Sequence, residues 1–383
     1  MRKIAVVTGS RSEYGLLRNI LFKINESSKL ELELIVTGSH LAPNHGYTVN
    51  EIYQDCLHIA DQLPIHSNLE DSSAISREMG LLMIELSKTF SRIKPDILLI
   101  LGDRYEIFAA ASVAMVMNIP IAHISGGEVT EGAIDDQIRH AITKMAHLHF
   151  PGNELYANNI VQMGEESWRV FNFGDVGIEN ITKIKFKTKE EIKENLNIEV
   201  SEDSLLITYH PVTQELQDLE KQVDNLISAL KVINRQMIIT YPNSDCGNEV
   251  IIRKMISFRD ENTNVHLFDN LGIINYLSIM KLCGVVVGNS SSGIVEAPYL
   301  KIPVVNIGNR QKGRLMANNV ISCGYTTSEI IESLNVALSE SFKSKTQKTI
   351  SLYGEGNTSE KIVDIIENIE INEKLLIKKL GWR

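Results

Sequence analysis

Acidic and basic side chains gather at two places in the first half of the chain. Asp103 and Arg104 follow the apolar run 97–101, and Glu128 comes shortly after the run 119–124. A downstream segment with helical period carries Asp135, Asp136, Arg139 and His140. Their spacing of three and four residues lets them share one helix face. Carboxylates at strand ends could serve as general acids and bases, and they could equally be helix caps with an ion pair.

A second kind of chemistry is indicated in the second half of the chain. The apolar run 285–287 leads into a Gly-Asn turn and three serines, Ser290, Ser291 and Ser292, and then into a helical segment. Free N–H groups at a helix start, with hydroxyls beside them, suit a diphosphate. Glu296, one turn into the helix, could accept hydrogen bonds from a ribose diol. The alternative is a serine-capped helix after a turn glycine. Strand, loop, helix and acid in this order favour a nucleotide.

Single residues at other strand ends add to this pattern. His210 directly follows the run 205–209. A histidine at this position can be packed in the core, exposed on the surface or catalytic. Arg11 stands in a loop between a strand and a helix, where it could bind phosphate or lie on the surface. This loop lacks both Gly-x-Gly-x-x-Gly and the P-loop pattern. Further cations follow the run 303–307: Arg310, Lys312 and Arg314.

The elements that must position these residues alternate between short apolar runs and longer segments with helical period. Strands are predicted at 4–7, 32–36, 96–101, 119–124, 147–150, 205–209, 237–241, 265–268, 285–287 and 303–307. Helices are predicted at 14–24, 73–93, 105–117, 133–146, 183–194 and 359–380. This alternation predicts an α/β protein with two Rossmann-like domains, each a doubly wound parallel sheet.

Length, charge and cysteine content limit the class of protein. A chain of 383 residues, 43% hydrophobic, is expected to form two domains. The net charge of −10 argues against binding to nucleic acid or an anionic membrane but allows a small anionic ligand. The cysteines are scattered, so neither a zinc site nor a disulfide framework is expected. The first apolar run is too short for a signal peptide or membrane span, so we expect a cytoplasmic protein.

Six spaced motifs, in one order, resemble the UDP-N-acetylglucosamine 2-epimerase family over essentially the whole chain. They are 9–15 (Gly-Ser-Arg-Ser-Glu-Tyr-Gly), 102–104 (Gly-Asp-Arg), 126–140 (Gly-Gly-Glu, Asp-Asp and Arg-His), 210–213 (His-Pro-Val-Thr), 288–293 (Gly-Asn-Ser-Ser-Ser-Gly) and 309–314 (Asn-Arg-Gln and a later Arg). The Gly-Asp-Arg and His-Pro-Val-Thr forms are similar to the hydrolysing branch, which makes precursors of sialic and legionaminic acids.

The resemblance implies a GT-B architecture, in which two Rossmann-like domains face a central cleft. The domains are expected at 1–174 and 175–357, with a C-terminal helix at 358–383 returning to the first. The resemblance assigns catalysis to Asp103, Glu128, Asp135, Asp136 and His210. It assigns UDP binding to Arg11, His210, Asn243, Ser290, Ser291, Ser292 and Glu296. It assigns contacts to substrate or phosphate to Arg104, Arg139, Arg310 and Arg314. No metal or cofactor is expected. The expected partners are a UDP-sugar substrate, UDP as product, and further copies of the chain in a dimer or tetramer.

The implied activity converts UDP-N-acetylglucosamine to free N-acetylmannosamine and UDP, by elimination through 2-acetamidoglucal followed by hydration. The alternative substrate is UDP-N,N′-diacetylbacillosamine. Many hydrolysing members carry a glutamate at the position of Ser125. Either Glu128, Glu131 or a water takes its role here, or the serine marks a subgroup that acts on a different sugar, such as the bacillosamine derivative. Leu16 stands where non-hydrolysing relatives carry a lysine. A GT-B glycosyltransferase and a non-catalytic nucleotide-sugar-binding regulator are the alternatives from other classes.

Overall fold

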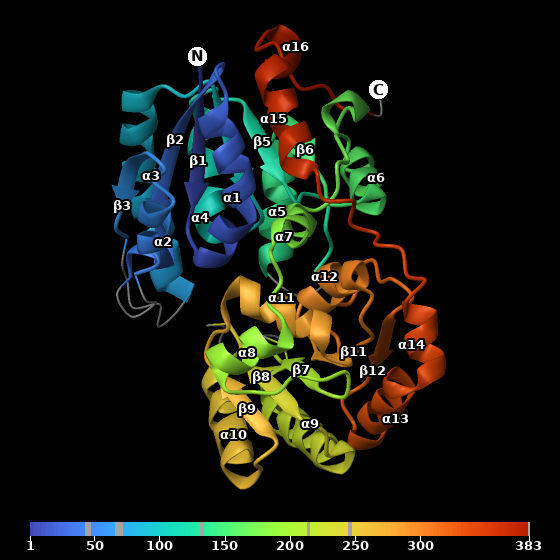
Figure 1. Ribbon diagram of the computed structural model, residues 1–383. Helices are drawn as coiled ribbons and strands as arrows, with labels where there is room; N and C mark the ends of the chain where they lie inside the picture. Colours follow the sequence, from blue (N-terminus) through green and yellow to red (C-terminus); the bar gives the residue numbers. More distant parts are fainter. Residues whose placement is uncertain (43–46, 66–71, 131–133, 213–214, 244–246, 382–383) are drawn as a thin grey trace. The chain divides into compact units, whose positions relative to one another are not determined.

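The chain divides into two compact α/β units (Figure 1). The computed structural model describes residues 1–42, 47–65, 72–130, 134–212, 215–243 and 247–381. The first unit contains residues 1–128 and 134–180 together with the segment that starts at Tyr353, and the second is made mainly of residues 181–352. The chain leaves the first unit within α7 (Val176–Lys183), a few residues beyond the expected boundary at 174.

The first unit is built on a parallel sheet that has six strands in the described residues, in the order β3-β2-β1-β4-β5-β6. The strands are β1 (Arg2–Thr8), β2 (Leu30–Thr37), β3 (Ile59–Leu63), β4 (Ile97–Leu101), β5 (Ile121–Ile124) and β6 (Leu148–Phe150). Alternate residues of β1 enter different cores, because Ile4 and Val6 lie on one face of the sheet while Ala5 and Val7 lie on the other. Burial on both faces explains why the central strands are almost continuously apolar.

Helices cover both faces of this sheet. They are α1 (Arg11–Glu26), the 3-10 turn η1 (Gly38–Leu41), α2 (Val49–Gln54), α3 (Ser72–Ile93), α4 (Tyr105–Val116), α5 (Ile134–Met145), α6 (Glu154–Gln162), the 3-10 turn η3 (Ser167–Arg169), α7, α15 (Thr358–Asn368) and α16 (Glu373–Leu376). Side chains of α1 and α15 share the core with Ile4 and Val6, whereas α3, α4 and α5 share the core of the opposite face. The predicted helices near 14–24, 73–93 and 105–117 are confirmed.

The second unit repeats this architecture. Its described strands form a parallel sheet in the order β12-β11-β10-β7-β8-β9. They are β7 (Leu205–Thr208), β8 (Met237–Thr240), β9 (Val265–Phe268), β10 (Val285–Gly288), β11 (Val304–Ile307) and β12 (Val320–Cys323). Numbered from its own first strand, each sheet has the order 3-2-1-4-5-6 that is typical of dinucleotide-binding folds. The prediction of two doubly wound parallel sheets is confirmed.

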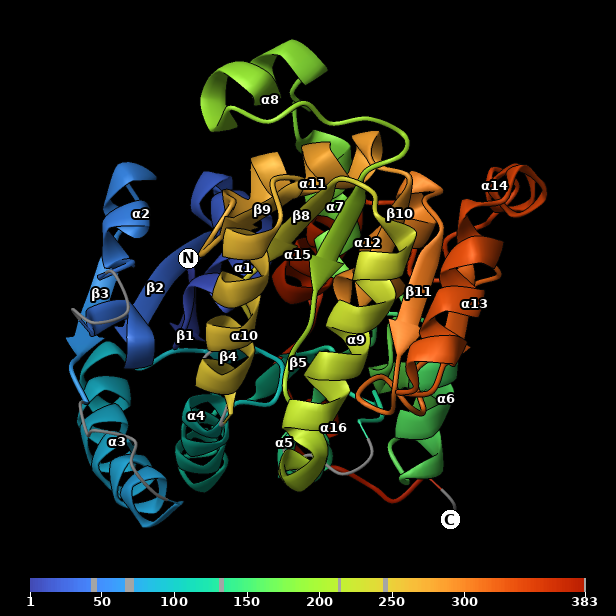
Figure 2. The same cartoon turned by 90° about the horizontal axis from the view of Figure 1, so that it is seen from below.

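Helices also flank the second sheet. They are α8 (Lys189–Leu196), the 3-10 turn η4 (Leu216–Asp218), α9 (Leu219–Ile233), α10 (Asn248–Glu261), α11 (Gly272–Leu282), α12 (Ser292–Leu300), α13 (Thr327–Leu338) and α14 (Glu340–Thr346). Figure 2 shows α9 beside both α10 and α13, and these three helices share one apolar core with the sheet. The C-termini of β7 and β10 are therefore held at fixed positions by packing on the sheet.

Two strands were missed by the sequence analysis, β3 and β12, and each lies at one edge of its sheet. Most residues of β3 are only half-buried, and β12 contains no fully buried residue. An edge strand has one neighbour and less cover, so it needs no continuous apolar run. The apolar pattern that revealed the central strands is therefore absent from these two.

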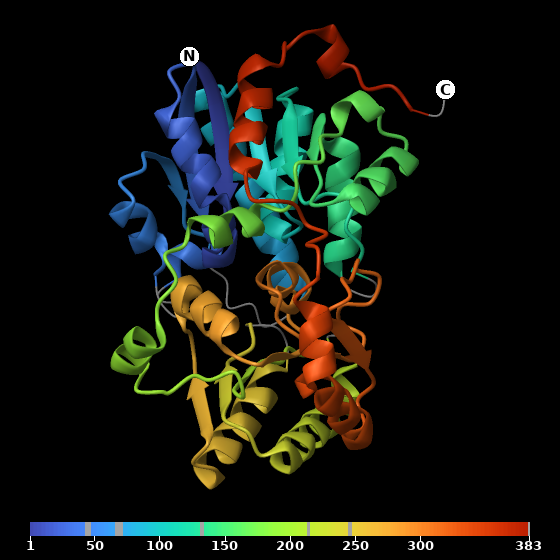
Figure 3. The same cartoon turned by 45° about the vertical axis from the view of Figure 1, so that its right-hand side comes forward.

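The C-terminal segment packs on the first unit as two helices, although one helix was expected over 358–383. Ile362, Val363 and Ile366 of α15 enter the core that α1 also lines. Figure 3 shows this red helix alongside the blue N-terminal elements, in agreement with the contacts between α15 and α1. The helix ends before Ile369, whose backbone is extended, and Asn372 caps the short α16 by accepting from the Leu375 N–H.

Two further findings concern membranes and thiols. No helix in the described part of the chain is both long and apolar enough to cross a bilayer. Cys56, Cys283 and Cys323 are free thiols, and Cys246 lies outside the described residues.

A close glycine contact anchors the returning segment. Gly174 and Gly354 both have positive φ angles, +93° and +98°, and a Cβ on Gly354 would lie 2.7 Å from the Gly174 Cα. We expect Gly354→Ala to lower the free energy of unfolding by at least about 2 kcal/mol, because the methyl group meets backbone in a left-handed conformation. Urea unfolding measures this.

Gly80→Ala is the matched control, because Gly80 is exposed in α3 and a Cβ there has open space. It should raise stability by up to about 1 kcal/mol, the helix propensity difference between the two residues. Equal effects of the two substitutions would contradict a steric role for Gly354.

Candidate active site

The first unit has a self-capped helix at the switch point of its sheet, where the connections from β1 and β4 go to opposite faces. In a capping box at the start of α1, the Ser10 hydroxyl accepts from the Glu13 N–H. The Glu13 carboxylate accepts from the N–H groups of Gly9 and Ser10, at 2.7 and 3.1 Å. These two N–H groups lie just before the helix, which begins at Arg11. The Glu13 carboxylate therefore folds back onto the residues that lead into α1.

Glu13 belongs to a buried cluster with Glu106 and Arg104. The two glutamates are 6% and 1% exposed. Arg104 Nη2 lies 3.0 Å from Glu106 Oε1, and Arg104 Nε lies 3.9 Å from Glu13 Oε1. Burial raises the pKa of Glu13 to about 7, while Arg104 acts in the opposite direction and Glu106 adds to the rise. Arg104, which was predicted to contact substrate or phosphate, has its guanidinium engaged by these carboxylates.

Arg139 brings together several of the predicted acidic residues. Its side chain is almost fully buried and forms an ion pair with Asp103, which follows β4. The same guanidinium lies 3.4 Å from the Asp136 carboxylate in the first turn of α5 and donates to the Glu128 carbonyl at 2.9 Å. His140 Nε2 is 3.4 Å from the other Asp136 oxygen. One buried cation thus fixes carboxylates from two elements of the first unit.

The remaining acidic candidates lie close by in the sequence. Glu128 is buried, and Asp135 is exposed in the first turn of α5. Glu131 lies outside the described residues. Ser125, at the position where many hydrolysing members carry glutamate, follows β5 in a left-handed conformation with φ +64°, and its N–H donates to the Phe150 carbonyl at 3.0 Å. The structure therefore groups Asp103, Asp136 and the Glu128 carbonyl around Arg139.

The second unit has the corresponding switch point between β7 and β10. Asn289 bridges it, because its Oδ1 accepts from the His210 N–H at 2.7 Å and its Nδ2 donates to the His210 carbonyl at 2.9 Å. Gly288, with φ +130°, permits the close approach of the strands, since a Cβ there would lie 2.0 Å from the Thr208 carbonyl oxygen. The Asn289 carbonyl accepts from Gln311 at 2.9 Å and from Arg310 at 3.2 Å.

His210 has a defined protonation state. Its Nδ1 accepts the backbone N–H of Asn243 at 3.1 Å, so Nδ1 carries no proton. Burial, with the nearby Arg310 cation, lowers the pKa of His210 to about 3. The ring is therefore neutral at physiological pH, with its proton on Nε2. His210 can donate a hydrogen bond from Nε2, but it does not act there as a cation.

The start of α12 differs from the start of α1 in what occupies its N–H groups. Within the described residues, the N-cap residue Ser291 makes no capping hydrogen bond with its side chain, and the first turn contains no acidic residue. Ser290 Oγ lies 3.3 Å from Ser292 Oγ and 3.4 Å from the Ser292 N, so the hydroxyls cluster at the helix start. Glu296 lies one turn further along α12, and its side chain is half-buried. The N–H groups of Gly293 and Ile294 donate to the Ser290 and Ser291 carbonyls at 3.2 and 2.9 Å. This helix start, unlike that of α1, therefore presents serine hydroxyls without a carboxylate cap.

Comparison with known proteins identifies the family. Residues 22–367 match the family model described as UDP-N-acetylglucosamine 2-epimerase. The chain belongs to the UDP-N-acetylglucosamine 2-epimerase family. It is 41% identical to the GDP/UDP-N,N′-diacetylbacillosamine 2-epimerase (hydrolyzing) of Campylobacter jejuni, over 84% of each chain. It is 34% identical to the UDP-N,N′-diacetylbacillosamine 2-epimerase (hydrolyzing) of Legionella pneumophila, over 99% of each chain.

The UDP-N-acetylglucosamine 2-epimerase of Neisseria meningitidis is 30% identical, over 97% of this chain and 96% of the relative. The crystal structure of UDP-GlcNAc 2-epimerase from Neisseria meningitidis bound to UDP-GlcNAc has a TM-score of 0.82 at 20% identity, covering 95% of this chain and 99% of that one, and this likeness shows the fold. The predicted resemblance to the hydrolysing branch is confirmed, and so is the prediction of an enzyme that acts on a nucleotide sugar.

Several cations of this 2-epimerase family member lie near the two switch points. Arg310 contacts the Asn289 carbonyl, and Arg314 is half-buried on the same segment. Arg11, in the first turn of α1, has its Nε 2.6 Å from Glu51 Oε1 of α2, and both side chains are about 40% exposed. An exposed pair of this kind contributes little to stability, so a phosphate could replace Glu51 at small cost.

Sequence analysis gave no role to three residues of these sites. Glu13 carried a usable signal, because Ser-x-x-Glu before an apolar helix is the capping-box pattern. Gln311 belongs to the motif at 309–314 but received no role, and His123 carried no signal of one. Gln311 is buried against the Asn289 carbonyl, and His123 is fully buried beside the Asp103 turn. Only tertiary contacts reveal what these two side chains do.

The pKa of Glu13 gives a stability prediction. Because burial raises this pKa from 4.5 to about 7, folding is penalised as the pH rises through that interval and the carboxylate must ionise inside the protein. Glu13→Gln removes the ionisation while keeping an acceptor. The variant should gain stability relative to the wild type between pH 5 and pH 8, by up to about 3 kcal/mol. Denaturant unfolding at several pH values measures this.

Glu191→Gln is the control, since Glu191 makes the same kind of capping box at α8 but is exposed. It should show no comparable gain at high pH. A Glu13→Gln difference that stays constant from pH 5 to pH 8 would refute the buried-acid explanation.

Proposed function

We propose that this protein is the hydrolysing 2-epimerase of UDP-N,N′-diacetylbacillosamine, which releases UDP and the free 2-epimeric sugar. Sequence analysis took UDP-N-acetylglucosamine as the first substrate and the bacillosamine derivative as the alternative. The comparisons favour the alternative, because relatives at 41% and 34% identity are named for diacetylbacillosamine and the relative named for UDP-N-acetylglucosamine is 30% identical. The name of the Campylobacter jejuni relative includes GDP as well as UDP, so the nucleobase of the substrate is tested along with its sugar.

The contrast between the two switch points supports this function most directly. At the first, Glu13 fills the helix start and Asp103 and Asp136 stand beside a buried arginine. At the second, the start of α12 has serine hydroxyls and no acidic residue in its first turn, with Asn289, neutral His210 and Arg310 next to it. The second site suits a diphosphate, and the first suits proton transfer. We infer that the first unit supplies the proton-transferring groups and the second unit the diphosphate-binding groups of the proposed reaction.

The chemistry requires both kinds of site. The hydrogen on carbon 2 of the sugar is weakly acidic because no carbonyl flanks it, and its removal becomes feasible as the bond from carbon 1 to the diphosphate breaks. Donors must therefore stabilise the departing diphosphate while a carboxylate takes the proton. Water then adds to carbon 1 of the resulting glycal, and a proton returns to carbon 2 on the opposite face. Acid–base groups on two sides of the ring are needed, which accounts for several carboxylates.

We assign roles to the described residues on this basis. Asp103 and Asp135 are the acid–base pair. Asp136 and Arg139 hold Asp103 in place, and Glu128 follows the neighbouring strand β5. Ser290, Ser291 and Ser292 donate to the diphosphate, with the Nε2–H of His210 and the cations of Arg310, Arg314 and Arg11. Glu296 and Asn243 contact the nucleoside. Arg104 acts through Glu13 and Glu106, because its guanidinium is bound to them.

Substrate and stereochemistry are tested together. The protein is incubated separately in deuterium oxide with UDP-N,N′-diacetylbacillosamine, its GDP counterpart and UDP-N-acetylglucosamine, and the released sugars are identified by proton NMR. We expect kcat/KM for the preferred bacillosamine nucleotide to exceed that for UDP-N-acetylglucosamine by at least about 100-fold, because a site that hydrogen-bonds an extra acetamido group rejects a sugar lacking it. The product should carry deuterium at carbon 2. Protium at that position, or sugar attached to an acceptor instead of free, would reject the proposal.

The acid–base residues are tested by removing their charge. Asp103→Asn and Asp135→Asn should each lower kcat by about 100- to 10,000-fold, which is the usual contribution of a general acid or base. Asp224→Asn, at an exposed ion pair with Lys254, is the control and should keep the wild-type rate. If both active-site variants release UDP at near wild-type rates, these aspartates serve only as helix caps and ion-pair partners.

A further inference from the structure

The turn that carries Asp103 is held from the neighbouring strand. Gly102 adopts φ +78°, and both of its backbone groups are paired with β5. Its N–H donates to the Ile124 carbonyl at 3.0 Å, and its carbonyl lies 2.8 Å from Nε2 of His123. A carbonyl can only accept, so His123 donates from Nε2. The backbone that precedes Asp103 is thus fixed by the side chain of His123, which is not among the residues assigned to substrate.

The His123 ring is itself tightly confined. It is completely buried, and burial lowers the pKa of His123 to about 3, so the ring is neutral. A Cβ on Gly126 would lie 3.0 Å from His123 Nδ1, which shows that the following turn packs directly against the ring. Within the described residues, Nδ1 has no hydrogen-bond partner. Among the described residues, the one hydrogen bond of the ring is therefore the bond from Nε2 to the Gly102 carbonyl.

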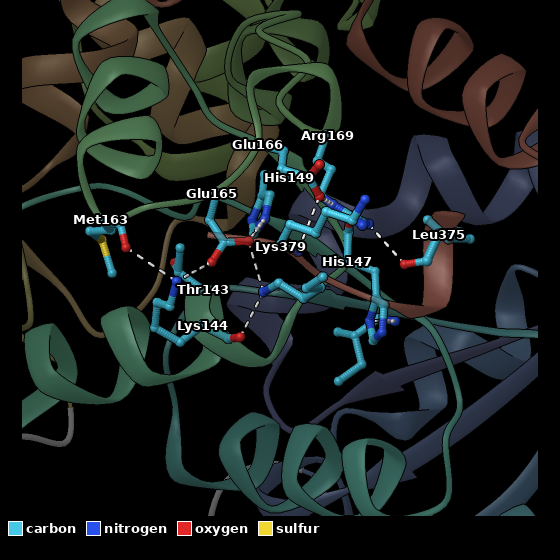
Figure 4. Close-up of polar contacts among 12 residues, drawn as sticks. Thr143, Lys144, His147, His149, Met163, Glu165, Glu166, Arg169, Leu375 and Lys379 are labelled. Carbon is cyan, nitrogen blue, oxygen red and sulfur yellow. Dashed lines mark hydrogen bonds and ion pairs between the residues drawn. The ribbon is translucent and has the colours of Figure 1, made fainter. Parts of the chain in front are cut away.

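A buried polar row continues behind His123. His149 is its direct partner in the β5–β6 register, and His149 Nε2 lies 3.2 Å from Glu165 Oε2. Glu165 is 1% exposed and pairs with Lys144 at 2.5 Å and with Lys378 at 2.7 Å. Figure 4 shows Glu165 between Lys144 and His149. The hydrogen bond from His149, together with the two lysines, lowers the pKa of Glu165 to about 2 despite its burial, so the carboxylate stays charged.

Lys378 belongs to the C-terminal segment, which is anchored nearby. The fully buried Arg169 donates to the carbonyls of Leu375 and Lys374, each at 2.8 Å, and pairs with Glu166 at 2.9 Å (Figure 4). Lys378 is 19% exposed and also donates to the Lys144 carbonyl at 2.7 Å. The end of the chain thus supplies one of the cations that balance the buried Glu165.

We propose that His123 is a positioning residue for Asp103, and that the C-terminal segment supports it through Lys378, Glu165 and His149. His123 holds the Gly102 carbonyl. His149, its partner in the β5–β6 register, donates to Glu165, and burial lowers the pKa of His149 and so favours the neutral ring. Without Lys378, the Glu165 carboxylate loses one of its positive partners and attracts a proton to His149 more strongly. A protonated His149 would place a cation beside His123. This inference rests on the proposed function, because it assigns Asp103 to the acid–base chemistry.

The first test separates His123 from a general packing role. His123→Leu should lower kcat by about 100-fold with KM within about threefold of wild type, because a displacement of a catalytic group by about 1 Å has an effect of that size. His123→Gln places an amide N–H near the position of Nε2 and should restore kcat to within about tenfold of wild type. Equal loss in both variants at equal thermal stability, or a loss confined to KM, would overturn the role.

The second test concerns the C-terminal segment. Lys378→Met keeps the length of the side chain and removes its charge, and it should lower kcat by about five- to tenfold at unchanged KM. Lys379→Met is the matched control, because Lys379 is exposed and makes its contact with Glu166 through its backbone N–H. A wild-type kcat in Lys378→Met, or an equal loss in Lys379→Met, would remove the C-terminal segment from the proposal.

A spectroscopic readout distinguishes this inference from the proposed function. Long-range proton–nitrogen NMR spectra of the wild-type protein, with His123→Gln used for assignment, should show His123 as a neutral ring protonated at Nε2. Protonation at Nδ1, or a charged ring at pH 7, would refute the positioning contact whether or not the substrate is correct. Failure of the wild-type protein to release UDP from any of the sugars would refute the proposed function and leave this spectrum as the test of the contact.

Discussion

The N–H groups at the start of a helix need an acceptor, and the two units of this protein meet that requirement in different ways. At α1 the Glu13 carboxylate supplies the acceptor from within the chain. At α12 the first turn is Ser-Gly-Ile-Val and supplies no acid. Two sheets of the same strand order therefore differ at their switch points, with a carboxylate at one helix start and serine hydroxyls at the other. A capping glutamate at α1 and its absence at α12 make the second unit the better site for an anion.

Charge follows the same division. Around Arg139 the structure places Asp103 and Asp136, and around the partly exposed Arg104 it places Glu13 and Glu106, so each of these two guanidinium groups contacts two carboxylates. In the second unit Arg310 contacts a backbone carbonyl, and the adjacent His210 is kept neutral by burial. An acidic surface favours proton abstraction, and a surface of donors and cations favours a departing diphosphate. The proposed elimination needs the two surfaces to be made by separate elements, because carboxylates beside a diphosphate would repel it.

Most of the sheet structure was predictable from the sequence because central strands of a parallel sheet are buried on both faces. The run 97–101 is entirely buried, and its apolar pattern left no competing interpretation. The edge strands β3 and β12 have no such pattern, since half-buried strands need only alternate apolar residues. The C-terminal segment was predicted as helical, but its break before Asn372 depends on a local cap and on Arg169, which lies about 200 residues earlier.

The candidate site was predictable to the extent that its residues follow strands directly. Asp103, His210 and Ser290 could be named because the carboxyl ends of parallel strands carry ligand sites. His123 could not, since a histidine inside an apolar strand looks like a core residue until its contact with Gly102 is seen. Arg139 could be named from its spacing to the aspartates of its own helix and from the resemblance, but its ion pair with Asp103, 36 residues away, could not be predicted. A sequence pattern predicts the helix or strand that a residue belongs to. It does not predict which residues of other elements that residue contacts.

Two buried arginines of the first unit show how the acceptors of a guanidinium define its role. Arg169 contacts one carboxylate, Glu166, and several backbone carbonyls of the C-terminal segment. Its charge is balanced, and the carbonyls cannot take up a proton, so this arginine serves only to fasten the chain. Arg139 contacts the Glu128 carbonyl and the carboxylates of Asp103 and Asp136, which come from different elements. A buried arginine between two carboxylates fixes the orientation of a base, and this is the arrangement that the proposed reaction requires at carbon 2.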